Sequence, residues 1–295
     1  MGVATRSCTG TTSTIRDGPA RATAAAMPRT LACMSSTRTE ITQARRSVRF
    51  VTWARAWRAG AVSYDDVADE TEGDEEHLVA DAPDTWTDIP LREAVRALSR
   101  LHPDEIRLVL PAPGDPRGLP GPGPFTGRAL AVGEAVVAGR LGLVPEVREH
   151  TSGSGDTFSI VVWQTFPLPS TDPFTASAPD EPAQAEAELS EALADATAAL
   201  SRLDVAAWRP ELAGALAALR KPDHSTDLPP GFSPRARRLF ARASVLDRVL
   251  ALAAVVAPGG AVNGFEAQRR DDALRPLTVA CRRALMAACN SPLEP

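Results

Sequence analysis

Lysine and long apolar runs are almost missing from this chain of 295 residues, in which Lys221 is the single lysine. No run of about 18 apolar residues occurs, so the sequence excludes a membrane-spanning helix of ordinary length. The 32 basic residues are outnumbered by 37 acidic ones, and the formal net charge is −5. A general nucleic-acid-binding protein carries a basic surplus, so the charge balance disfavours nucleic acid as a partner.

Because lysine is nearly absent, almost all positive charge is carried by arginine. Arginine, alanine, glycine and proline all have GC-rich codons, so a GC-rich coding sequence explains this composition. The alternative explanation is selection for arginines that bind anions, because a guanidinium binds phosphate or carboxylate through two hydrogen bonds. The total number of arginines does not support that alternative, which requires a particular site where arginines could bind an anion.

Cysteines are few and scattered, at positions Cys8, Cys33, Cys281 and Cys289. They form no CxxC pair and no cluster with histidine at zinc spacing, so we expect no metal site. Cys281 and Cys289 fall in one expected helix, about 12 Å apart along its axis. A disulfide needs Cα atoms within about 7 Å. We therefore expect two small buried hydrophobic residues and a reducing, cytoplasmic location.

Catalytic motifs are missing as well. The four histidines form neither HExxH nor HxH, and the nucleophile pattern GxSxG does not occur. The acidic block at 69–76 does not match a calcium-binding loop, and we interpret it as a solvated acidic loop. Trp53 and Trp57 lie four residues apart in an expected helix, where packing on the core is a simpler role than stacking on a ligand. No cofactor is expected and no catalytic residue is assigned.

The composition indicates three segments and a linker. Hydrophobic residues make up 44% of the chain, enough for a sizeable core in one large or two small domains. Residues 1–40 are rich in Thr, Ser, Ala and Arg and lack a signal-peptide core. We interpret them as a disordered tail, as translated upstream sequence before Met27 or Met34, or as a transit peptide. Residues 41–167 are expected to form an α/β domain, 168–182 a linker, and 183–295 a helical region.

The periodicity of apolar residues predicts an α+β fold, with a small mixed sheet in the first half and helices in the second. A helix is expected from Ile41 to Trp57, and a second begins at Ser63, with Asp66 completing a capping box. Residues 77–110 are expected to form a strand, a helix and a second strand, with the two strands parallel. A further helix is expected at 129–139. Strands are expected at 143–149 and 157–166, joined by a hairpin turn. In the second half, Ser233 and Pro234 begin a long helix, and Pro276 should kink or split the last one.

The loop at 111–128 is the strongest candidate for a site. It follows an expected strand and contains five glycines, an arrangement that brings a ligand close to the backbone in open α/β sheets. The residues that would bind an anion are Asp115, Arg117, Gly121, Gly123, Gly127 and Arg128. Neither GxxxxGK[ST] nor GxGxxG is matched, and the prolines lack the N–H groups that a phosphate loop uses. A rigid structural loop is therefore the competing interpretation.

Four stretches of the chain are RLVLPAPGDPRGLPGPGPFT from Arg107 to Thr126, GEAV at 133–136, GLVPEV at 142–147 and ALRPL at 273–277. Together they resemble an uncharacterised conserved protein family of GC-rich bacteria. The resemblance covers residues 45–295. It implies no activity and transfers no catalytic residue, and it leaves residues 1–40 outside the fold.

From these patterns we expect a soluble, cytoplasmic binding or regulatory protein. A protein partner or a second copy would bind the Ala-rich helical region or the face that carries Trp53 and Trp57. The alternative is an enzyme or sensor that binds a small phosphate-bearing anion at the loop 111–128. Neither hypothesis requires nucleic acid, a membrane, a metal or a cofactor.

Overall fold

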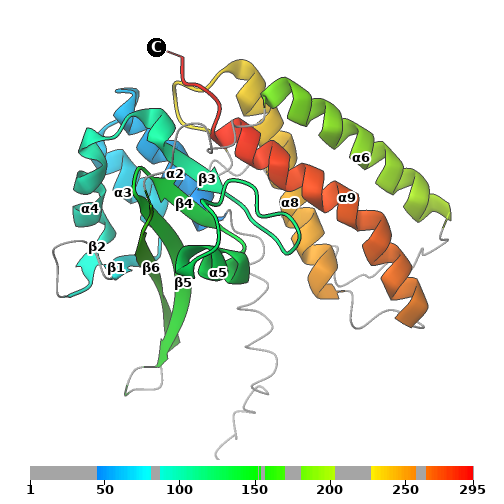
Figure 1. Cartoon of the computed structure of the whole chain (residues 1–295), viewed down its shortest axis with the longest axis horizontal. Helices are drawn as coiled ribbons and strands as arrows, with labels where there is room; N and C mark the ends of the chain where they lie inside the picture. Colours follow the sequence, from blue (N-terminus) through cyan, green and yellow to red (C-terminus); the bar gives the residue numbers. More distant parts are fainter. Residues whose placement is uncertain are drawn as a thin grey trace, which may run out of the picture. The chain divides into compact units, whose positions relative to one another are not determined.

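A six-stranded sheet and a group of long helices make up the part of the chain that the computed structural model describes (Figure 1). That part comprises residues 45–80, 87–151, 153, 157–169, 181–202, 227–256 and 264–294. All of it belongs to one compact unit, Arg38–Pro295. The expected α+β class is confirmed. The N-terminal tail, most of the linker, Cys8, Cys33 and Lys221 lie outside the described residues.

The sheet has the strand order β2-β1-β6-β5-β4-β3 and is antiparallel except where β1 meets β6. The strands are β1 (Glu76–Ala80), β2 (Ile89–Pro90), β3 (Ile106–Val109), β4 (Ala135–Ala138), β5 (Leu141–Thr151) and β6 (Thr157–Pro167). The expected hairpin of β5 and β6 is confirmed by continuous pairing from Leu141↔Pro167 to Thr151↔Thr157. β6 lies inside the sheet, and Val161, Val162 and Trp163 are all buried, as its two apolar faces predicted.

The strand, helix and strand expected at 77–110 are present, but the expected parallel arrangement of the two strands is wrong. β1 and β3 do not pair, because β6, β5 and β4, which come later in the chain, lie between them. The intervening segment is a short α-helix, α4 (Leu91–Ala94), that continues as the 3-10 helix η1 (Val95–Arg100). A second 3-10 turn, η2 (Pro103–Glu105), leads into β3. β5 pairs with β6 and β4 pairs with β5 through short antiparallel connections, and these pairs occupy the positions in the sheet that a parallel pair of β1 and β3 would have needed.

The helix expected at 129–139 is also wrong in position. Helix α5 (Pro124–Val132) begins earlier, inside the predicted loop, and Ala135–Ala138 is strand β4. Pro124 occupies the first turn, where a missing N–H costs nothing, and Gly133 ends the helix at φ 83°. α5 packs on β5 through Phe125. A Cβ atom added at Gly142 would lie 2.5 Å from that ring, so only glycine fits there.

Helices α2 (Arg46–Arg58) and α5 cover opposite faces of the sheet. Val136, Ala138 and Leu143 pack in the cluster that contains α2, whereas Ala135, Val137 and Val144 pack with Phe125 and Ala129 of α5. This alternation is the two-residue period of a strand. Helix α3 (Tyr64–Glu72) follows α2 and begins at the predicted capping box, in which Ser63 and Asp66 bond to each other's backbone N–H.

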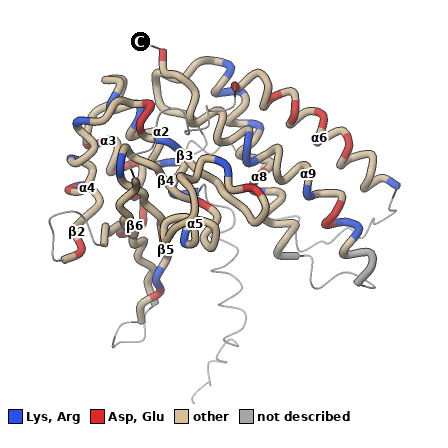
Figure 2. Tube along the Cα trace, viewed as in Figure 1, with Lys and Arg blue, Asp and Glu red and all other residues tan. Residues whose placement is uncertain are grey.

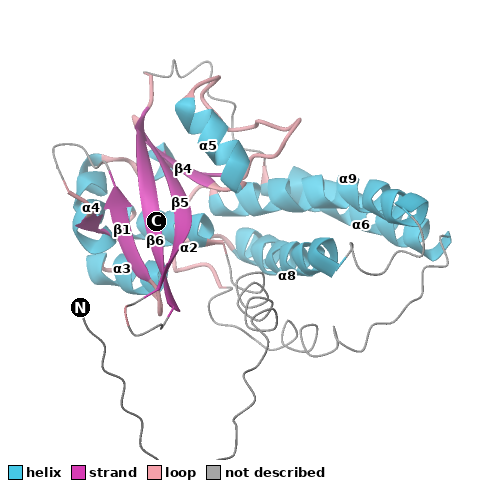
Figure 3. Cartoon of the chain, turned by 90° about the horizontal axis from the view of Figure 1, so that it is seen from below, coloured by secondary structure: helices cyan, strands magenta, loops and turns pink. Residues whose placement is uncertain are grey.

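The described residues of the second half contain three long helices, α6 (Pro182–Arg202), α8 (Pro234–Val256) and α9 (Gly264–Cys289). α9 packs against both α6 and α8 (Figures 1 and 3). Ser233 caps α8 as predicted, accepting a hydrogen bond from the N–H of Ala236 at 3.2 Å. Pro276 lies inside α9, which is assigned as a helix without a break, so the expected split is wrong. Among the described helices, none is long and apolar enough to cross a membrane.

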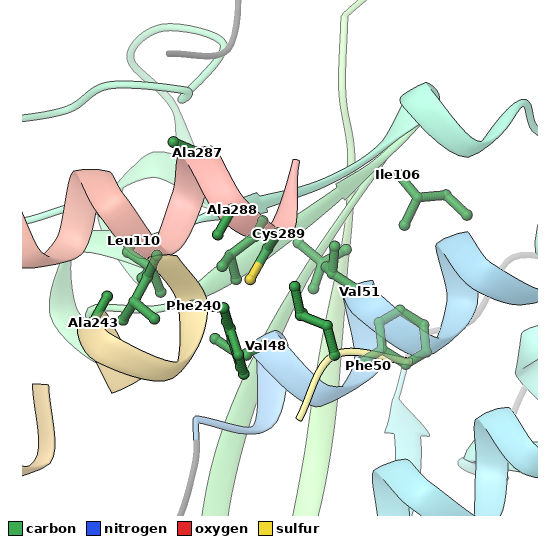
Figure 4. Packing of buried hydrophobic residues seen from close by; sticks show 14 of the residues in the cluster. Val48, Phe50, Val51, Ile106, Leu110, Phe240, Ala243, Ala287, Ala288 and Cys289 are labelled. Atoms are coloured by element: carbon green, nitrogen blue, oxygen red, sulfur yellow. The ribbon is translucent and has the colours of Figure 1, made fainter. Parts of the chain in front are cut away.

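One hydrophobic cluster joins the two halves. Figure 4 shows Val48 and Val51 of α2 beside Phe240 of α8 and Ala288 of α9. Cys281 and Cys289 are fully buried in it as free thiols, which confirms their predicted role as small hydrophobic residues. Burial raises the pKa of both thiols, so they stay protonated.

Arg55 joins the same elements by polar contacts. Its buried guanidinium donates to the carbonyls of Pro103 and of Cys289, and lies 2.9 Å from the Asp104 carboxylate. The contact with Cys289 places a cation at the C-terminal end of α9, where the free carbonyls of a helix favour positive charge.

The edge strand β3 is covered by side chains of α9. Asn290, directly after the last turn of the helix, accepts from the Leu108 N–H at 2.8 Å and donates to the Leu108 carbonyl at 2.9 Å. One and two turns earlier, Met286 accepts from the Leu110 N–H and Arg282 donates to the Leu110 carbonyl. These are the outward-facing backbone groups of a strand that would otherwise be open to another chain.

A second polar network holds β1 against β6. Trp163 donates its indole N–H to Nδ1 of His77 at 3.2 Å, so the other ring nitrogen of His77 carries the proton and faces Glu75. Arg46 and Arg49 contact the same carboxylate. Partial burial alone would raise the pKa of Glu75. The hydrogen bonds from His77 and Arg46 outweigh it and hold the pKa at about 2.

Replacement of Asn290 should weaken the junction between α9 and the sheet. Asn290→Ala removes two hydrogen bonds and leaves both backbone groups of Leu108 unpaired, so the free energy of unfolding should fall by about 2 kcal/mol. Urea denaturation measures the change. Gln268→Ala, which removes an exposed polar side chain of the same helix, is the control and should change stability by less than about 0.5 kcal/mol. Equal effects of the two substitutions would contradict the edge-covering role.

The Glu75 network should give the protein a specific acid sensitivity. A carboxyl whose folded pKa lies below its ordinary value of 4.5 stabilises the fold above pH 4.5, and this contribution is lost as the pH falls towards 2. The loss should be on the order of 3 kcal/mol in the unsubstituted chain and absent in Glu75→Gln. Urea midpoints between pH 6 and pH 2 measure it, with exposed Glu149→Gln as the control. Parallel pH profiles for all three proteins would refute the assignment.

Candidate functional site

The loop after β3 begins with a tight turn that fixes the position of Asp115. The N–H of Asp115 donates to the Ala112 carbonyl at 2.9 Å, and the N–H of Ala112 donates back at 3.2 Å. Between them, Pro113 and Gly114 occupy the two central positions, with Gly114 at φ 82°. Proline followed by a glycine of positive φ is the signature of a type II turn. The sequence therefore dictates locally where this carboxylate stands.

Three guanidinium groups surround that single carboxylate. Oδ2 of Asp115 lies 3.4 Å from Arg282 and 3.7 Å from Arg283, and Oδ1 lies 3.6 Å from Arg117. Arg283 also stands 3.9 Å from Glu188 of α6. In Figure 2 the loop after β3 runs beside the basic residues of α9. We call Arg117, Arg282 and Arg283 the arginine cluster.

Arg282 is the deepest member of the cluster, with 7% of its side chain exposed. Its two hydrogen bonds, to the Leu110 carbonyl and to Asp115, are both long at 3.4 Å, and its Nε has no partner. Burial lowers the pKa of Arg282, and nearby Asp115 opposes that shift. By comparison, Arg45 binds Asp247 of α8 through two contacts of 2.8 Å. Asp115 therefore pairs with Arg282 over a longer distance than Asp247 pairs with Arg45.

The other predicted residues of the loop do not join the cluster. Gly121 accepts a hydrogen bond from the Thr126 hydroxyl, Gly123 precedes α5, and Gly127 lies in its first turn. Arg128 pairs instead with Glu146 of β5 at 2.6 Å, and its hydrogen bond lowers the pKa of that carboxyl. The structure therefore brings Asp115 and Arg117 together and places Gly121, Gly123, Gly127 and Arg128 apart from them.

A cavity of about 380 Å³ lies on the α2 face of the sheet. Its walls are mostly apolar and come from α2, the sheet and the segment α4–η1. The lining residues are Phe50, Val79, Ile89, Leu91, Glu93, Ala94, Val95, Arg96, Ala97, Leu98, Leu141, Leu143 and Thr165. Val79, Val95 and Leu143 are buried core residues, so part of the lining belongs to the hydrophobic core.

Two of the lining side chains, Ala94 and Ala97, are small and occupy little volume beside the buried Val95 and Leu98. Glu93, Arg96 and Thr165 add polar groups to the lining. The Arg96 guanidinium also lies over the ring of Tyr64, 5.9 Å from its centre.

Other residues singled out by the sequence have structural partners. Trp53 and Trp57 pack, partly buried, against the core, and Trp57 meets Tyr64 edge to face. In the acidic block, Asp69 pairs with Arg92 and Glu75 belongs to the network of His77. His150 stacks on Phe158. Among the described residues no group of acidic, His or Cys side chains could hold a metal ion.

Sequence reasoning missed Arg282, Arg283 and Asn290. Arg282, Met286 and Asn290 recur every four residues on a helix face that is otherwise apolar, which was the available signal. Their partners lie more than 160 positions away along the chain, so no local pattern identifies them.

Comparison with known proteins gives a consistent assignment. The family model described as "Rv1486c-like protein, N-terminal domain" matches residues 47–180, and the C-terminal domain model of the same family matches 183–286. The Mycobacterium tuberculosis protein named "Uncharacterized protein Rv1486c" is 32% identical, covering 84% of this chain and 97% of its own length. "Uncharacterized protein ML1804" of Mycobacterium leprae is 28% identical over the same shares.

These names attach no activity to the relatives, in agreement with what the resemblance implied. No solved structure matches the chain. The division at 180–183 falls in the expected linker, most of which lies outside the described residues. On the two family models and the mycobacterial relatives together, the chain belongs to the Rv1486c-like protein family.

Proposed function

We propose that this protein is a small-molecule-binding protein whose ligand occupies the cavity between α4–η1 and the sheet. The observation that carries the proposal is the cavity itself, about 380 Å³ in volume and walled by core side chains. Ligand sites in proteins are concave, largely apolar and 300–1,000 Å³ in size, with a few placed polar groups.

The chemistry of the walls defines the class of ligand. Aliphatic and aromatic side chains on several elements favour a compact apolar body, since its burial contributes about 25 cal/mol per Å². Glu93, Arg96 and Thr165 favour a single polar or charged group at one end of the molecule. The lining is suited to binding and orientation, which agrees with the expected binding or regulatory role.

The expected cytoplasmic location belongs to the same proposal. It rests on cysteine usage, and the two described cysteines are buried, free thiols. A second copy or a protein partner at the helical region stays a prediction, for which Val245 of α8 supplies one exposed apolar side chain.

Filling the cavity should abolish binding of an apolar probe. We expect 8-anilinonaphthalene-1-sulfonate to bind the full chain saturably, because its rings match the apolar walls and its sulfonate can reach Arg96. Ala94→Leu and Ala97→Leu, which add three carbons each at the cavity, should weaken binding about tenfold or more, measured by fluorescence titration.

Ala187→Leu, the same change at an exposed position of α6, is the matched control and should bind the probe normally. Melting temperatures of all variants establish that each is folded. Unchanged affinity in folded Ala94→Leu and Ala97→Leu would refute the cavity as the site.

A further inference from the structure

One side chain of each charge lines the cavity, Glu93 and Arg96. Both residues are exposed, whereas Val95 and Leu98 of the same segment are buried, so the two charges stand where the cavity opens to solvent. Building on the function proposed above for this cavity, we propose that its ligand is a free apolar α-amino acid. The ammonium group of the ligand binds Glu93, its carboxylate binds Arg96, and its side chain enters the cavity.

The spacing of the segment α4–η1 brings the two charges together. Arg96 follows Glu93 by three positions, and side chains at that spacing are neighbours on an α-helix and are eclipsed on a 3-10 helix. Ala94 and Ala97 repeat the same spacing, and both also line the cavity. A small molecule in the cavity can therefore reach both charges at once.

Glu93 and Arg96 do not pair with each other. Opposite charges three positions apart often pair on a helix. Within the part of the chain that the structure describes, however, neither residue makes an ion pair within 4.0 Å. The neighbouring cation, Arg92, pairs with Asp65 at 3.3 Å and with Asp69. The opening of the cavity thus presents a carboxylate and a guanidinium that a ligand of both charges can bind.

A contact with Tyr64 orients the guanidinium of Arg96. The central carbon of that group lies 5.9 Å from the centre of the Tyr64 ring, and the Tyr64 hydroxyl donates to the carbonyl of Arg92. The ring contacts the flat face of the guanidinium, whose N–H donors lie in its plane. Those donors suit a carboxylate, which arginine binds through two parallel hydrogen bonds.

The two charges discriminate against ligands that carry only one. A simple carboxylic acid bound to Arg96 would place its negative charge near Glu93, and a simple amine bound to Glu93 would place its positive charge near Arg96. An α-amino acid carries both charges on one carbon atom, so each has an opposite partner. Phe50, Val79 and Leu143 then supply apolar walls for its side chain, in a cavity of about 380 Å³.

The test compares amino acids with analogues that lack one charge, by isothermal titration calorimetry of the full chain. L-Leucine or L-phenylalanine should bind, and the better of the two should bind about tenfold or more tightly than its own analogues. For leucine these are 4-methylpentanoate and 3-methylbutylamine, and for phenylalanine 3-phenylpropanoate and 2-phenylethylamine. No binding of either amino acid, or equal affinity for an analogue, would overturn the proposal.

Two substitutions should separate the roles of the charges. Arg96→Gln should weaken binding of the amino acid and of the acid analogue about fivefold or more, and should not weaken the amine. Glu93→Gln should weaken the amino acid and the amine, and should not weaken the acid. Identical losses for all three ligands in both variants would contradict these roles and overturn the proposal.

Two controls carry the same changes of charge outside the lining. Arg100→Gln alters an exposed residue of η1, and Glu149→Gln alters an exposed residue of β5. Both variants should bind the amino acid like the unsubstituted chain. An equal loss in Arg100→Gln and Arg96→Gln would reduce the effect to net charge and overturn the proposal.

The variants that fill the cavity distinguish the two proposals. Ala94→Leu should abolish binding of the amino acid as well as of the apolar probe, because the added carbons occupy the space of the ligand side chain. If the probe depends on Ala94 but no amino acid binds, the cavity remains a ligand site and the amino acid alone is refuted. If filling the cavity affects neither, both proposals fail.

Discussion

The free edge of β3 is the constraint on which much of this structure depends. A sheet ends in a row of unpaired N–H and C=O groups, and burying them without partners is costly. Here one side of α9 supplies the partners, with Asn290 for Leu108 and with Met286 and Arg282 for Leu110. α9 takes the place of a further strand beside β3. Its contacts with the edge recur every four residues, at Arg282, Met286 and Asn290, and this spacing sets the direction of the helix along the strand.

The contacts that cover the edge of β3 also determine which residues lie next to α9. With Asn290 at Leu108, Arg282 reaches the end of β3, directly beside the turn that carries Asp115. Arg283, the next residue, faces the same carboxylate and α6. The arginine cluster is therefore a consequence of the same register that protects the strand.

The two halves are matched by separate family models, yet their packing is shared. The hydrophobic cluster contains residues of α2, β3, α8 and α9, and Arg55 of α2 bonds to the last turn of α9. The cavity, in contrast, lies within the first half, between α4–η1, α2 and the sheet. An apolar ligand there would fill a space in the core of the first half.

The sequence by itself determined the features that rest on neighbouring residues. The capping box of Ser63 and Asp66, the start of α8 at Ser233 and Pro234, the β5–β6 hairpin and the turn at Asp115 all use hydrogen bonds within a few positions or a simple two-residue alternation. The α+β class follows from the same local periods. Tertiary structure alone decided the strand order, the early start of α5, the cavity and the partners of Asp115. Each of these features depends on contacts between residues that are far apart in the sequence. β6 lies between β1 and β5, Phe125 packs against Gly142, and the residue that follows α9 bonds to the edge of β3. Such contacts are set by complementary shape and unpaired backbone groups across long separations, and a periodic pattern along the chain does not carry them.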